Sequence, residues 1–263
     1  MFSLRMRLFT PTMLPARRRT GRAALLGAAL WVLCSSTGHA LQCDRAPAQP
    51  PPLPAAAQAD NLGVLKLRLL RYACSDAYDR DVLRTLKRAT SYLLRRADKV
   101  RRPAVVLDID ETALSNWPEI VANDFGYIPE GPCDAVPLGP CGWRAWVRSA
   151  KAEPLKPTLD LFRIAKTKGV AVFFLTGRRD RADERAATER NLRDAGYDSW
   201  VAVLMRPPED NGASAATYKA KERQKIEAQG YTIVVNVGDQ RSDLDGGHAE
   251  RGFLVPNPFY YIP

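Results

Sequence analysis

The chain has 263 residues, with 39 basic and 29 acidic side chains and a formal net charge of +10. Six arginines and no acid lie in the first 40 residues, so removing that segment leaves 33 basic against 29 acidic side chains, a net charge of +4. Such a balance gives no electrostatic case for binding nucleic acid, and we expect no nucleic-acid partner.

The first 40 residues have the pattern of an export signal. A basic segment precedes the apolar run 23–34 and a polar stretch that ends in Gly38-His39-Ala40, which is the pattern of a secretory signal peptide. The apolar run is too short to span a bilayer comfortably. We expect cleavage after Ala40, a periplasmic or secreted mature chain, and no stable membrane association after cleavage. An uncleaved anchor and lipidation at Cys34 stay open, as does the choice between Sec and twin-arginine export.

The mature chain has four cysteines and one histidine. The cysteines are Cys43, Cys74, Cys133 and Cys141, and an even number in an exported protein is typical of disulfides more than of metal ligands. We expect Cys133 to pair with Cys141 and Cys43 with Cys74, although the sequence leaves the pairing open. Only His248 remains in the mature chain, which disfavours sites built on histidine. Any chemistry must therefore rely largely on carboxylates.

Strands and helices alternate in most of the mature chain. Residues 41–59 are rich in proline and alanine and are interpreted as a tether. Helical spacing of apolar residues then predicts helices over about 60–73 and 79–97. The strands that follow are expected at 104–108, 170–175, 201–205, 232–237 and near 252–255, and the helices at about 157–168, 181–195 and 217–229.

This alternation predicts an α/β fold with a Rossmann-like core, in which helices flank a parallel central sheet. Runs such as VAVFFL and TIVVNV are apolar without alternation, as expected for parallel strands covered on both faces. Residues 113–156 have no clean period and are interpreted as a small cap insertion after the first strand, within a domain over 60–263. We expect Trp117 to be buried in the cap, whereas Trp143 and Trp146 either join its core or face the pocket and stack on an aromatic substrate.

Polar, glycine-flanked clusters follow three of the predicted strands. They read DIDET (108–112), TGR (176–178) and GDQRSD (238–243). The carboxyl ends of parallel strands meet at one edge of an open sheet, where ligands bind. We therefore expect one functional site at this edge.

Four acids in these clusters, Asp108, Asp110, Asp239 and Asp243, are expected to surround a metal ion. Carboxylates cannot stay ionised close together unless a cation offsets their repulsion. Oxygen ligands without histidine or thiolate favour a hard ion, so Mg²⁺ is the expected cofactor. A carboxylate facing a phosphate beside a cation can act as a nucleophile, and a second carboxylate can protonate the leaving alkoxide and later deprotonate water.

Other groups at the same edge are suited to hold a phosphoryl group. Thr176 and the backbone N–H groups of Ile109, Asp110 and Gly177 are the expected donors. A lysine would complete the charge balance. Lys219 opens a predicted helix, and Lys221 is its nearest rival. Arg178 is expected to be a surface residue or a cap partner more than a phosphate clamp.

These motifs resemble those of a known superfamily. DIDETALSN, FFLTGR, YKAKER and NVGDQRSDL, in this order, are similar to the four motifs of haloacid dehalogenase (HAD) superfamily phosphatases. The closer resemblance is to the acid phosphatases of subfamily IIIB, which include plant vegetative storage proteins and secreted bacterial relatives. The ending LVPNPFYYIP is similar to the tail of that group, and the resemblance covers roughly residues 60–263.

The resemblance implies a role for each site residue. Asp108 would be the nucleophile that forms a phosphoaspartyl intermediate, and Asp110 the general acid and base, which also binds metal through its carbonyl. Thr176 would hold phosphate, and Lys219 would bridge the nucleophile and the phosphate. The remaining two acids follow the fourth motif: Asp239 would be a metal ligand, and Asp243 would support the metal or Lys219.

The implied function is that of an exported, Mg²⁺-dependent acid phosphatase that hydrolyses phosphate monoesters, best at mildly acidic pH. A nucleotide or an aryl phosphate is a candidate substrate. A phosphotransferase and a non-catalytic storage or binding protein on the same scaffold stay open as alternatives. Some storage relatives lack the nucleophilic acid, so the presence of Asp108 favours an active enzyme. The cap carries no readable code for the substrate, and the oligomeric state is left open.

Overall fold

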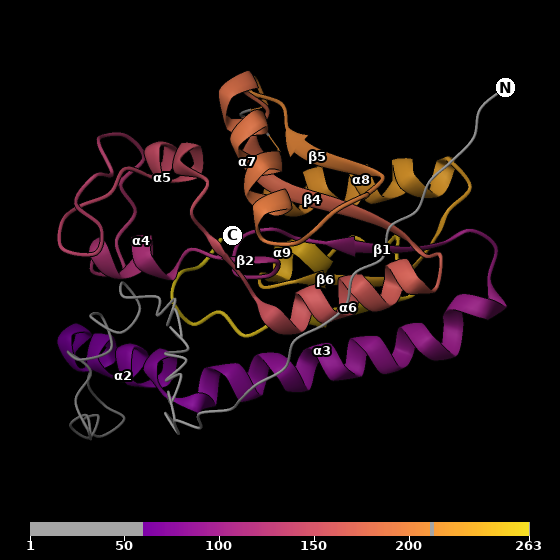
Figure 1. Ribbon diagram of the computed structural model, residues 1–263, viewed down its shortest axis with the longest axis horizontal. Coiled ribbons are helices and arrows are strands. Elements are labelled where there is room, and N and C mark those ends of the chain that lie inside the picture. Colours follow the sequence, from indigo (N-terminus) through magenta and orange to yellow (C-terminus); the bar gives the residue numbers. More distant parts are fainter. Residues whose placement is uncertain (1–59, 211–212, 263) are drawn as a thin grey trace, which may run out of the picture. The chain divides into compact units, whose positions relative to one another are not determined.

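Two helices open the part of the chain that the computed structural model describes, residues 60–210 and 213–262 (Figure 1). They are α2 (Leu62–Cys74) and α3 (Asp76–Arg96), and the 3-10 helix η1 (Ala97–Lys99) follows them. The expected signal peptide, the expected tether and Cys43 lie outside the described residues. Within the described ranges, no helix is both long enough and apolar enough to cross a membrane.

α3 begins before the predicted start near residue 79, because Ser75 caps it. The Ser75 side chain accepts a hydrogen bond from the backbone N–H of Ala77 (3.3 Å), which satisfies one of the free donors of the first turn. Buried side chains then recur at helical spacing, namely Tyr78, Val82, Leu86, Ala89 and Leu93. This apolar face packs α3 against the sheet.

A five-stranded parallel sheet forms the centre of the fold, in the order β5-β4-β1-β6-β7. The strands are β1 (Pro103–Leu107), β4 (Ala171–Arg179), β5 (Ala202–Arg206), β6 (Thr232–Gly238) and β7 (Arg251–Leu254). The predicted α/β class with a parallel sheet is confirmed. β1 is the middle strand, so its carboxyl end is flanked by those of β4 and β6.

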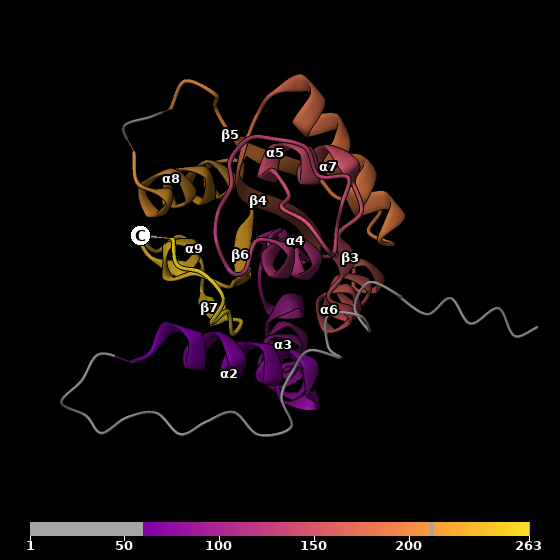
Figure 2. The same cartoon turned by 90° about the vertical axis from the view of Figure 1, so that its left-hand side faces the viewer.

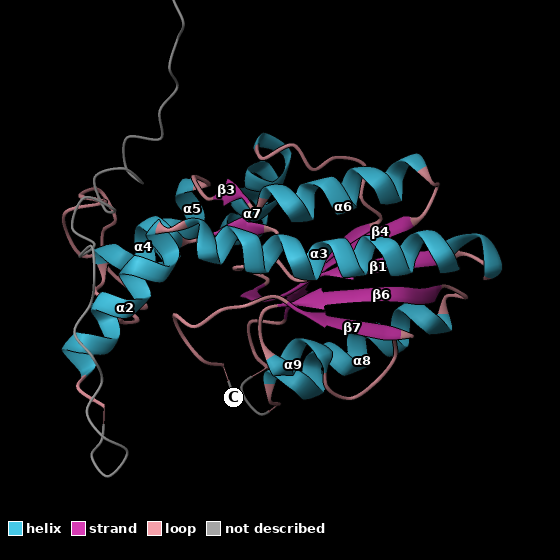
Figure 3. Ribbon diagram, turned by 90° about the horizontal axis from the view of Figure 1, so that it is seen from below, coloured by secondary structure: helices cyan, strands magenta, loops and turns pink. Residues whose placement is uncertain are grey.

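Helices cover both faces of this sheet (Figure 3). α6 (Lys156–Thr167) packs beside α3 on one face, and α8 (Ala215–Ala228) packs on the other. α7 (Ala182–Asp194) follows β4, and the short helix α9 (Arg241–Leu244) follows β6. The first three helices match the predicted ones in order, and α9 is a further short helix after Asp239.

Successive residues of β1 contribute to different sides of the core. Val105 and Leu107 belong to the apolar cluster that contains the buried residues of α3 and α6. Ala104 and Val106 belong to a second cluster with Ile226 of α8. Both faces of β1 are therefore buried, which is why its sequence is apolar without alternation.

The insertion between β1 and α6 forms a small cap beside the carboxyl edge of the sheet (Figure 2). A two-residue antiparallel ladder of β2 (Leu114–Ser115) and β3 (Glu153–Pro154) closes its base. The cap also contains α4 (Trp117–Ala122) and α5 (Trp143–Ser149). The predicted disulfide between Cys133 and Cys141 is present, and it staples the loop that precedes α5.

The tryptophans of the cap differ in burial. Trp117 and Trp146 are buried, and Trp143 is half-buried. The rings of Trp117 and Phe259 lie 5.2 Å apart between centroids, so the cap packs directly on the end of the described chain. The expected burial of Trp117 is confirmed, and Trp146 belongs with it in the core of the cap.

Candidate active site

Asp108 is the first residue after β1 and lies buried at the carboxyl edge of the sheet. Its backbone N–H donates to the carbonyl of Val237 in β6 (2.9 Å), and the chain then turns sharply around the carbonyl of Ile109. The Asp108 side chain is almost inaccessible, with 5% exposure of the residue. A carboxylate buried to this degree needs a counter-charge within the protein.

Lys219 of α8 supplies that counter-charge. Its Nζ donates to Oδ1 of Asp108 (2.6 Å) and to Oδ1 of Asp243. Burial lowers the pKa of Lys219, but the charges of the two carboxylates outweigh burial and raise the pKa above its ordinary value. Lys221 is exposed. The structure therefore brings Lys219, and not Lys221, to Asp108.

Asp239 and Asp243 follow β6 on either side of the start of α9. Oδ2 of Asp243 accepts a hydrogen bond from the backbone N–H of Gln240 (2.8 Å), as part of a capping box. Gly238 makes this arrangement possible, because a Cβ at that position would overlap the Asp243 side chain. The end of β6 thus places two acids beside Asp108.

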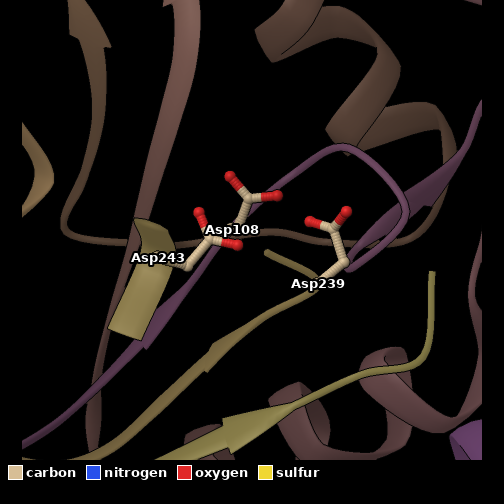
Figure 4. A group of neighbouring side chains, drawn as sticks. All are labelled: Asp108, Asp239 and Asp243. Carbon is tan, nitrogen blue, oxygen red and sulfur yellow. The ribbon is translucent and has the colours of Figure 1, made fainter. Parts of the chain in front are cut away.

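The side chains of Asp108, Asp239 and Asp243 converge (Figure 4). One carboxylate oxygen from each lies within 4.8 Å of the others, and all three residues are buried. Burial and, to a smaller extent, the charge of Asp243 raise the pKa of Asp239 to about 7. One lysine does not offset three acids, and donors that are all oxygen suit a hard cation. The residues present therefore fit a divalent ion such as Mg²⁺.

Asp110 lies outside this convergent group, because its carboxylate binds Arg178. Nη2 of Arg178 donates to Oδ1 of Asp110 (2.6 Å), and Nε lies 3.1 and 3.2 Å from its two oxygens. The ion pair uses only the side chain of Asp110, whereas the metal contact expected of this residue uses its backbone carbonyl. Arg178 therefore fixes the orientation of the Asp110 carboxylate.

The expectation that Arg178 is a surface residue is wrong. Arg178 is 4% exposed, and its Nη1 donates to Oγ1 of Thr188 in α7 (3.1 Å). Burial lowers the pKa of its guanidinium, but the charge and hydrogen bonds of Asp110, together with the charges of Asp108 and Glu111, outweigh burial and raise the pKa. Because Asp110 compensates the buried charge, the arginine can lie inside the protein. Its guanidinium also lies 5.6 Å from the ring centroid of Trp143.

Thr176 and Gly177 lie at the end of β4, next to Arg178 in sequence. Thr176 is buried, and its Oγ1 accepts a hydrogen bond from the N–H of Arg178 (3.1 Å). Gly177 is exposed, with open space where a Cβ would lie. The register between β4 and β5 shifts between Thr176 and Arg179. The strand is therefore irregular at the position where we expected a phosphoryl group to bind.

Sequence reasoning assigned no role to Glu111 and Asn116, which form a buried network at the site. Nδ2 of Asn116 donates to Oδ1 of Asp110 (2.9 Å) and to Oε2 of Glu111 (3.0 Å). Oδ1 of Asn116 accepts from Nε1 of Trp146 in the cap (2.8 Å). Asn116 therefore connects the cap to Asp110. A signal for both residues was available, because they lie within DIDETALSN.

Glu111 has a left-handed backbone, with φ of 50°, and a buried side chain. Burial, and next the charge of Asp110, raise its pKa to about 7 against the opposing effect of hydrogen bonds from Asn116 and Tyr260. The hydroxyl of Tyr260 donates to Oε2 of Glu111 (2.7 Å). The contact joins residues that are 149 positions apart, so no local pattern could have predicted it.

Glu119 in α4 is a second buried glutamate and gives a prediction for stability. Burial raises its pKa from 4.5 to about 7; the hydrogen bond from Asn123 opposes the shift, and the charge of Asp110 adds to it. Because the pKa is higher in the folded protein than in the unfolded chain, protonation of Glu119 favours the folded state. This stabilisation is fully present below pH 4.5 and is lost as the pH rises through 7. The shift corresponds to at most about 3 kcal/mol.

Glu119→Gln keeps the carbonyl that accepts from Asn123 (2.6 Å) but cannot ionise. Between pH 5 and pH 8, we expect the unfolding free energy of the wild type to fall by up to about 3 kcal/mol relative to that of the variant. Urea unfolding at the two pH values measures this difference. The same substitution at Glu153, which is exposed, should leave it unchanged. An equal pH dependence in Glu119→Gln and the wild type would contradict the assignment.

Comparison with known proteins places the chain in a family. Residues 55–263 match the profile described as HAD superfamily, subfamily IIIB (Acid phosphatase). Acid phosphatase 1 of Solanum lycopersicum is 36% identical over 162 residues, which are 61% of this chain and 60% of that protein. The Stem 28 kDa glycoprotein of Glycine max is 37% identical over 160 residues, 60% of this chain and 59% of that protein. Vegetative storage protein 1 of Arabidopsis thaliana is 31% identical over 161 residues, 60% of this chain and 55% of that protein.

Among solved structures, the class C acid phosphatase from Bacillus anthracis has a similar fold. Its TM-score is 0.60 at 23% identity, over 76% of this chain and 86% of that chain. At this identity the similarity shows the fold alone. The match to the plant relatives spans about 60% of the length of the first two. Because the family profile matches all of the described residues, the chain belongs to subfamily IIIB of the HAD superfamily, the acid phosphatase subfamily.

Proposed function

We propose that the protein is an exported, Mg²⁺-dependent acid phosphatase that hydrolyses phosphate monoesters through a phosphoaspartyl intermediate on Asp108. The observation that carries this proposal is the buried Asp108 carboxylate, which pairs with Lys219 and converges with two further acids at the end of the central strand. In a chain of the acid phosphatase subfamily, this arrangement supports nucleophilic catalysis by a carboxylate. Export rests on the N-terminal sequence pattern alone.

The proposed metal ligands are Asp108, Asp239 and the backbone carbonyl of Asp110, with Asp243 beside them. A bound Mg²⁺ would supply Lewis-acid chemistry, because it offsets the charge of the carboxylates and of the phosphate. Asp243 already accepts a hydrogen bond from Lys219, so it supports the lysine as well as the metal.

In the first step, a carboxylate oxygen of Asp108 attacks phosphorus and the bond from phosphorus to the ester oxygen breaks. Asp110 gives its proton to the leaving alkoxide, and the product alcohol departs. The phosphoryl oxygens are held by Thr176, the backbone N–H of Gly177 and Lys219, which stabilise the negative charge on these oxygens in the transition state. The result is an acyl phosphate on Asp108.

In the second step, water attacks the phosphorus of that acyl phosphate. Asp110 takes a proton from the water, the bond between phosphorus and the Asp108 oxygen breaks, and inorganic phosphate leaves. Arg178 and Asn116 both contact the Asp110 carboxylate, so its oxygens are held in one orientation through both steps. Asp110 is thereby ready to act as acid and then as base.

The proposed substrate class is a small phosphate monoester, with nucleotides and aryl phosphates as the first candidates. The half-buried ring of Trp143 lies beside the Arg178 guanidinium that holds Asp110. An aromatic leaving group protonated by Asp110 would therefore lie near a ring. A screen of phosphate release from nucleotides, sugar phosphates and aryl phosphates tests this preference.

Removal of the metal should inactivate the enzyme reversibly. We expect EDTA to lower the rate of p-nitrophenyl phosphate hydrolysis by the purified mature chain at least about 100-fold, because metal stabilisation of transition-state charge contributes several kcal/mol. Excess Mg²⁺ should restore the rate. A rate that chelation leaves unchanged would remove the metal from the mechanism.

The relatives that are named storage proteins favour one alternative, a non-catalytic storage protein on the same scaffold. The same assay separates the two functions, because a storage protein would release no p-nitrophenol with Mg²⁺ present. A phosphotransferase would instead pass the phosphoryl group to an added alcohol. Product analysis with and without glycerol as acceptor distinguishes it from a hydrolase.

A further inference from the structure

Residues 255–262, here named the tail segment, follow β7 and run along the edge of the site. The backbone N–H of Val255 donates to the carbonyl of Gly238 (2.8 Å), which starts the segment at the end of β6. The ring of Phe259 packs against Tyr78 of α3 (5.4 Å between centroids) and against Trp117 of the cap (5.2 Å). The tail segment is thus anchored in both the core and the cap.

One side of the tail segment holds Asp239. Nδ2 of Asn257 donates to Oδ2 of Asp239 (2.6 Å), and Nε2 of Gln240 donates to the same oxygen (2.7 Å). The other oxygen, Oδ1, has a long contact with the hydroxyl of Thr112 (3.4 Å). The two amides therefore occupy Oδ2 and leave Oδ1 as the oxygen that can bind a cation.

The amide of Asn257 is itself held in place. Its Oδ1 accepts a hydrogen bond from the backbone N–H of Phe259 (3.0 Å), which is a local side-chain turn. With the oxygen engaged in this way, the NH₂ group faces Asp239. The anchored ring of Phe259 thus fixes the orientation of the amide two residues earlier.

The other side of the tail segment holds the turn after β1. The hydroxyl of Tyr260 donates to Oε2 of Glu111 (2.7 Å), and Glu111 in turn accepts from the backbone N–H of Asn116. The backbone N–H of Ile262 donates to Oε1 of Gln240 (3.2 Å). The segment therefore contacts the loops that follow both β1 and β6, the two loops that carry the acids of the site.

We infer that the tail segment is a positioning element for the metal site, in which Asn257 orients Asp239 and Tyr260 holds the turn that carries Asp110. This inference rests on the proposed metal-dependent function. A carboxylate ligand whose second oxygen is hydrogen-bonded presents its first oxygen in one orientation, so less conformational entropy is lost when the ion binds. Asn257 contacts Asp239 and Tyr260 contacts Glu111, so the role assigned to each is to act through that acid.

The test uses the purified mature chain and Mg²⁺ alone. Isothermal titration calorimetry measures Mg²⁺ affinity in the wild type, in Asn257→Ala and in Tyr260→Phe, which removes only the hydroxyl. We expect Asn257→Ala to weaken Mg²⁺ binding by about 10- to 100-fold, the range for lost support of a metal ligand, and Tyr260→Phe to weaken it less. Tyr261→Phe is the matched control, because Tyr261 is 75% exposed, and it should bind like the wild type.

Thermal unfolding with and without Mg²⁺ separates positioning from a general loss of stability. In Asn257→Ala, the increase in Tm that saturating metal causes in the wild type should shrink at the same Mg²⁺ concentration. A Tm that falls equally with and without Mg²⁺, at unchanged affinity, would overturn the inference. Phosphatase activity is measured separately. If the wild type binds Mg²⁺ and Asn257→Ala weakens that binding, but the wild type hydrolyses no ester, the inference is supported and the proposed function is refuted. A wild type that binds no Mg²⁺ refutes both.

Discussion

Asp108→Asn is expected to abolish turnover of p-nitrophenyl phosphate, with a loss of at least about 10⁴-fold. The amide has nearly the shape of the carboxylate but cannot attack phosphorus, so no acyl phosphate can form. Lys219 keeps its contact with Asp243, and the fold should survive, with a change in unfolding free energy of no more than about 2 kcal/mol. Steady-state kinetics with saturating Mg²⁺ measure the first effect, and urea unfolding measures the second.

Asp245→Asn is the control for this variant. Asp245 is an exposed acid in the loop that carries Asp239 and Asp243, so the same chemical change there should leave turnover close to that of the wild type. Near-normal turnover by folded Asp108→Asn would end the proposal that Asp108 is the nucleophile.

Lys219→Met should damage both activity and stability. The substitution leaves the carboxylates of Asp108 and Asp243 buried without their shared cation, and breaking a buried ion pair in this way costs about 3–5 kcal/mol. Turnover should fall at least about 10³-fold, because a buried charge aimed at the phosphoryl group is lost. Urea unfolding without metal, and kinetics with saturating Mg²⁺, measure the two effects.

The loss of stability in Lys219→Met should depend on pH in a defined direction. Burial raises the pKa of Asp108 and the charge of Lys219 opposes that shift, so removing the lysine raises the pKa of Asp108 further. A raised folded pKa means that stability is lost as the pH rises, so the deficit should be larger at pH 8 than at pH 5. Lys221→Met, two residues away on the exposed face, should change neither property. Equal effects of the two substitutions would contradict the assignment of Lys219.

Apolar periodicity alone could not decide between Lys219 and Lys221 as the lysine of the site. Two residues on a helix are about 200° apart, so the two lysines face opposite sides of α8. Lys219, Arg223 and Ile226 are all buried, with the spacing of one helical face. Because two of these residues are charged, apolar periodicity does not reveal that face. The structure shows which lysine belongs to the site, because Lys219 contacts both Asp108 and Asp243.

Arg178 shows a different limit of sequence reasoning. Arginine side chains are mostly exposed, and no residue near Arg178 in the sequence predicts that this one is buried. Its burial depends on Asp110, which is 68 residues away and reaches it only because β1 and β4 are neighbours in the sheet. The contacts of Tyr260 with Glu111 and of Asn257 with Asp239 depend on the fold in the same way.

By itself, the sequence determined the parallel α/β core, the order of its strands and helices along the chain, and the edge of the sheet at which Asp108, Asp239 and Thr176 lie. These features follow from local patterns, because a strand buried on both faces must be apolar throughout and a parallel sheet must bring its carboxyl ends to one edge. Only the tertiary structure decided which partners neutralise and orient those acids. Such contacts join residues that are distant in the chain. Each charge needs its partner because it is buried, and it becomes buried only when the chain folds.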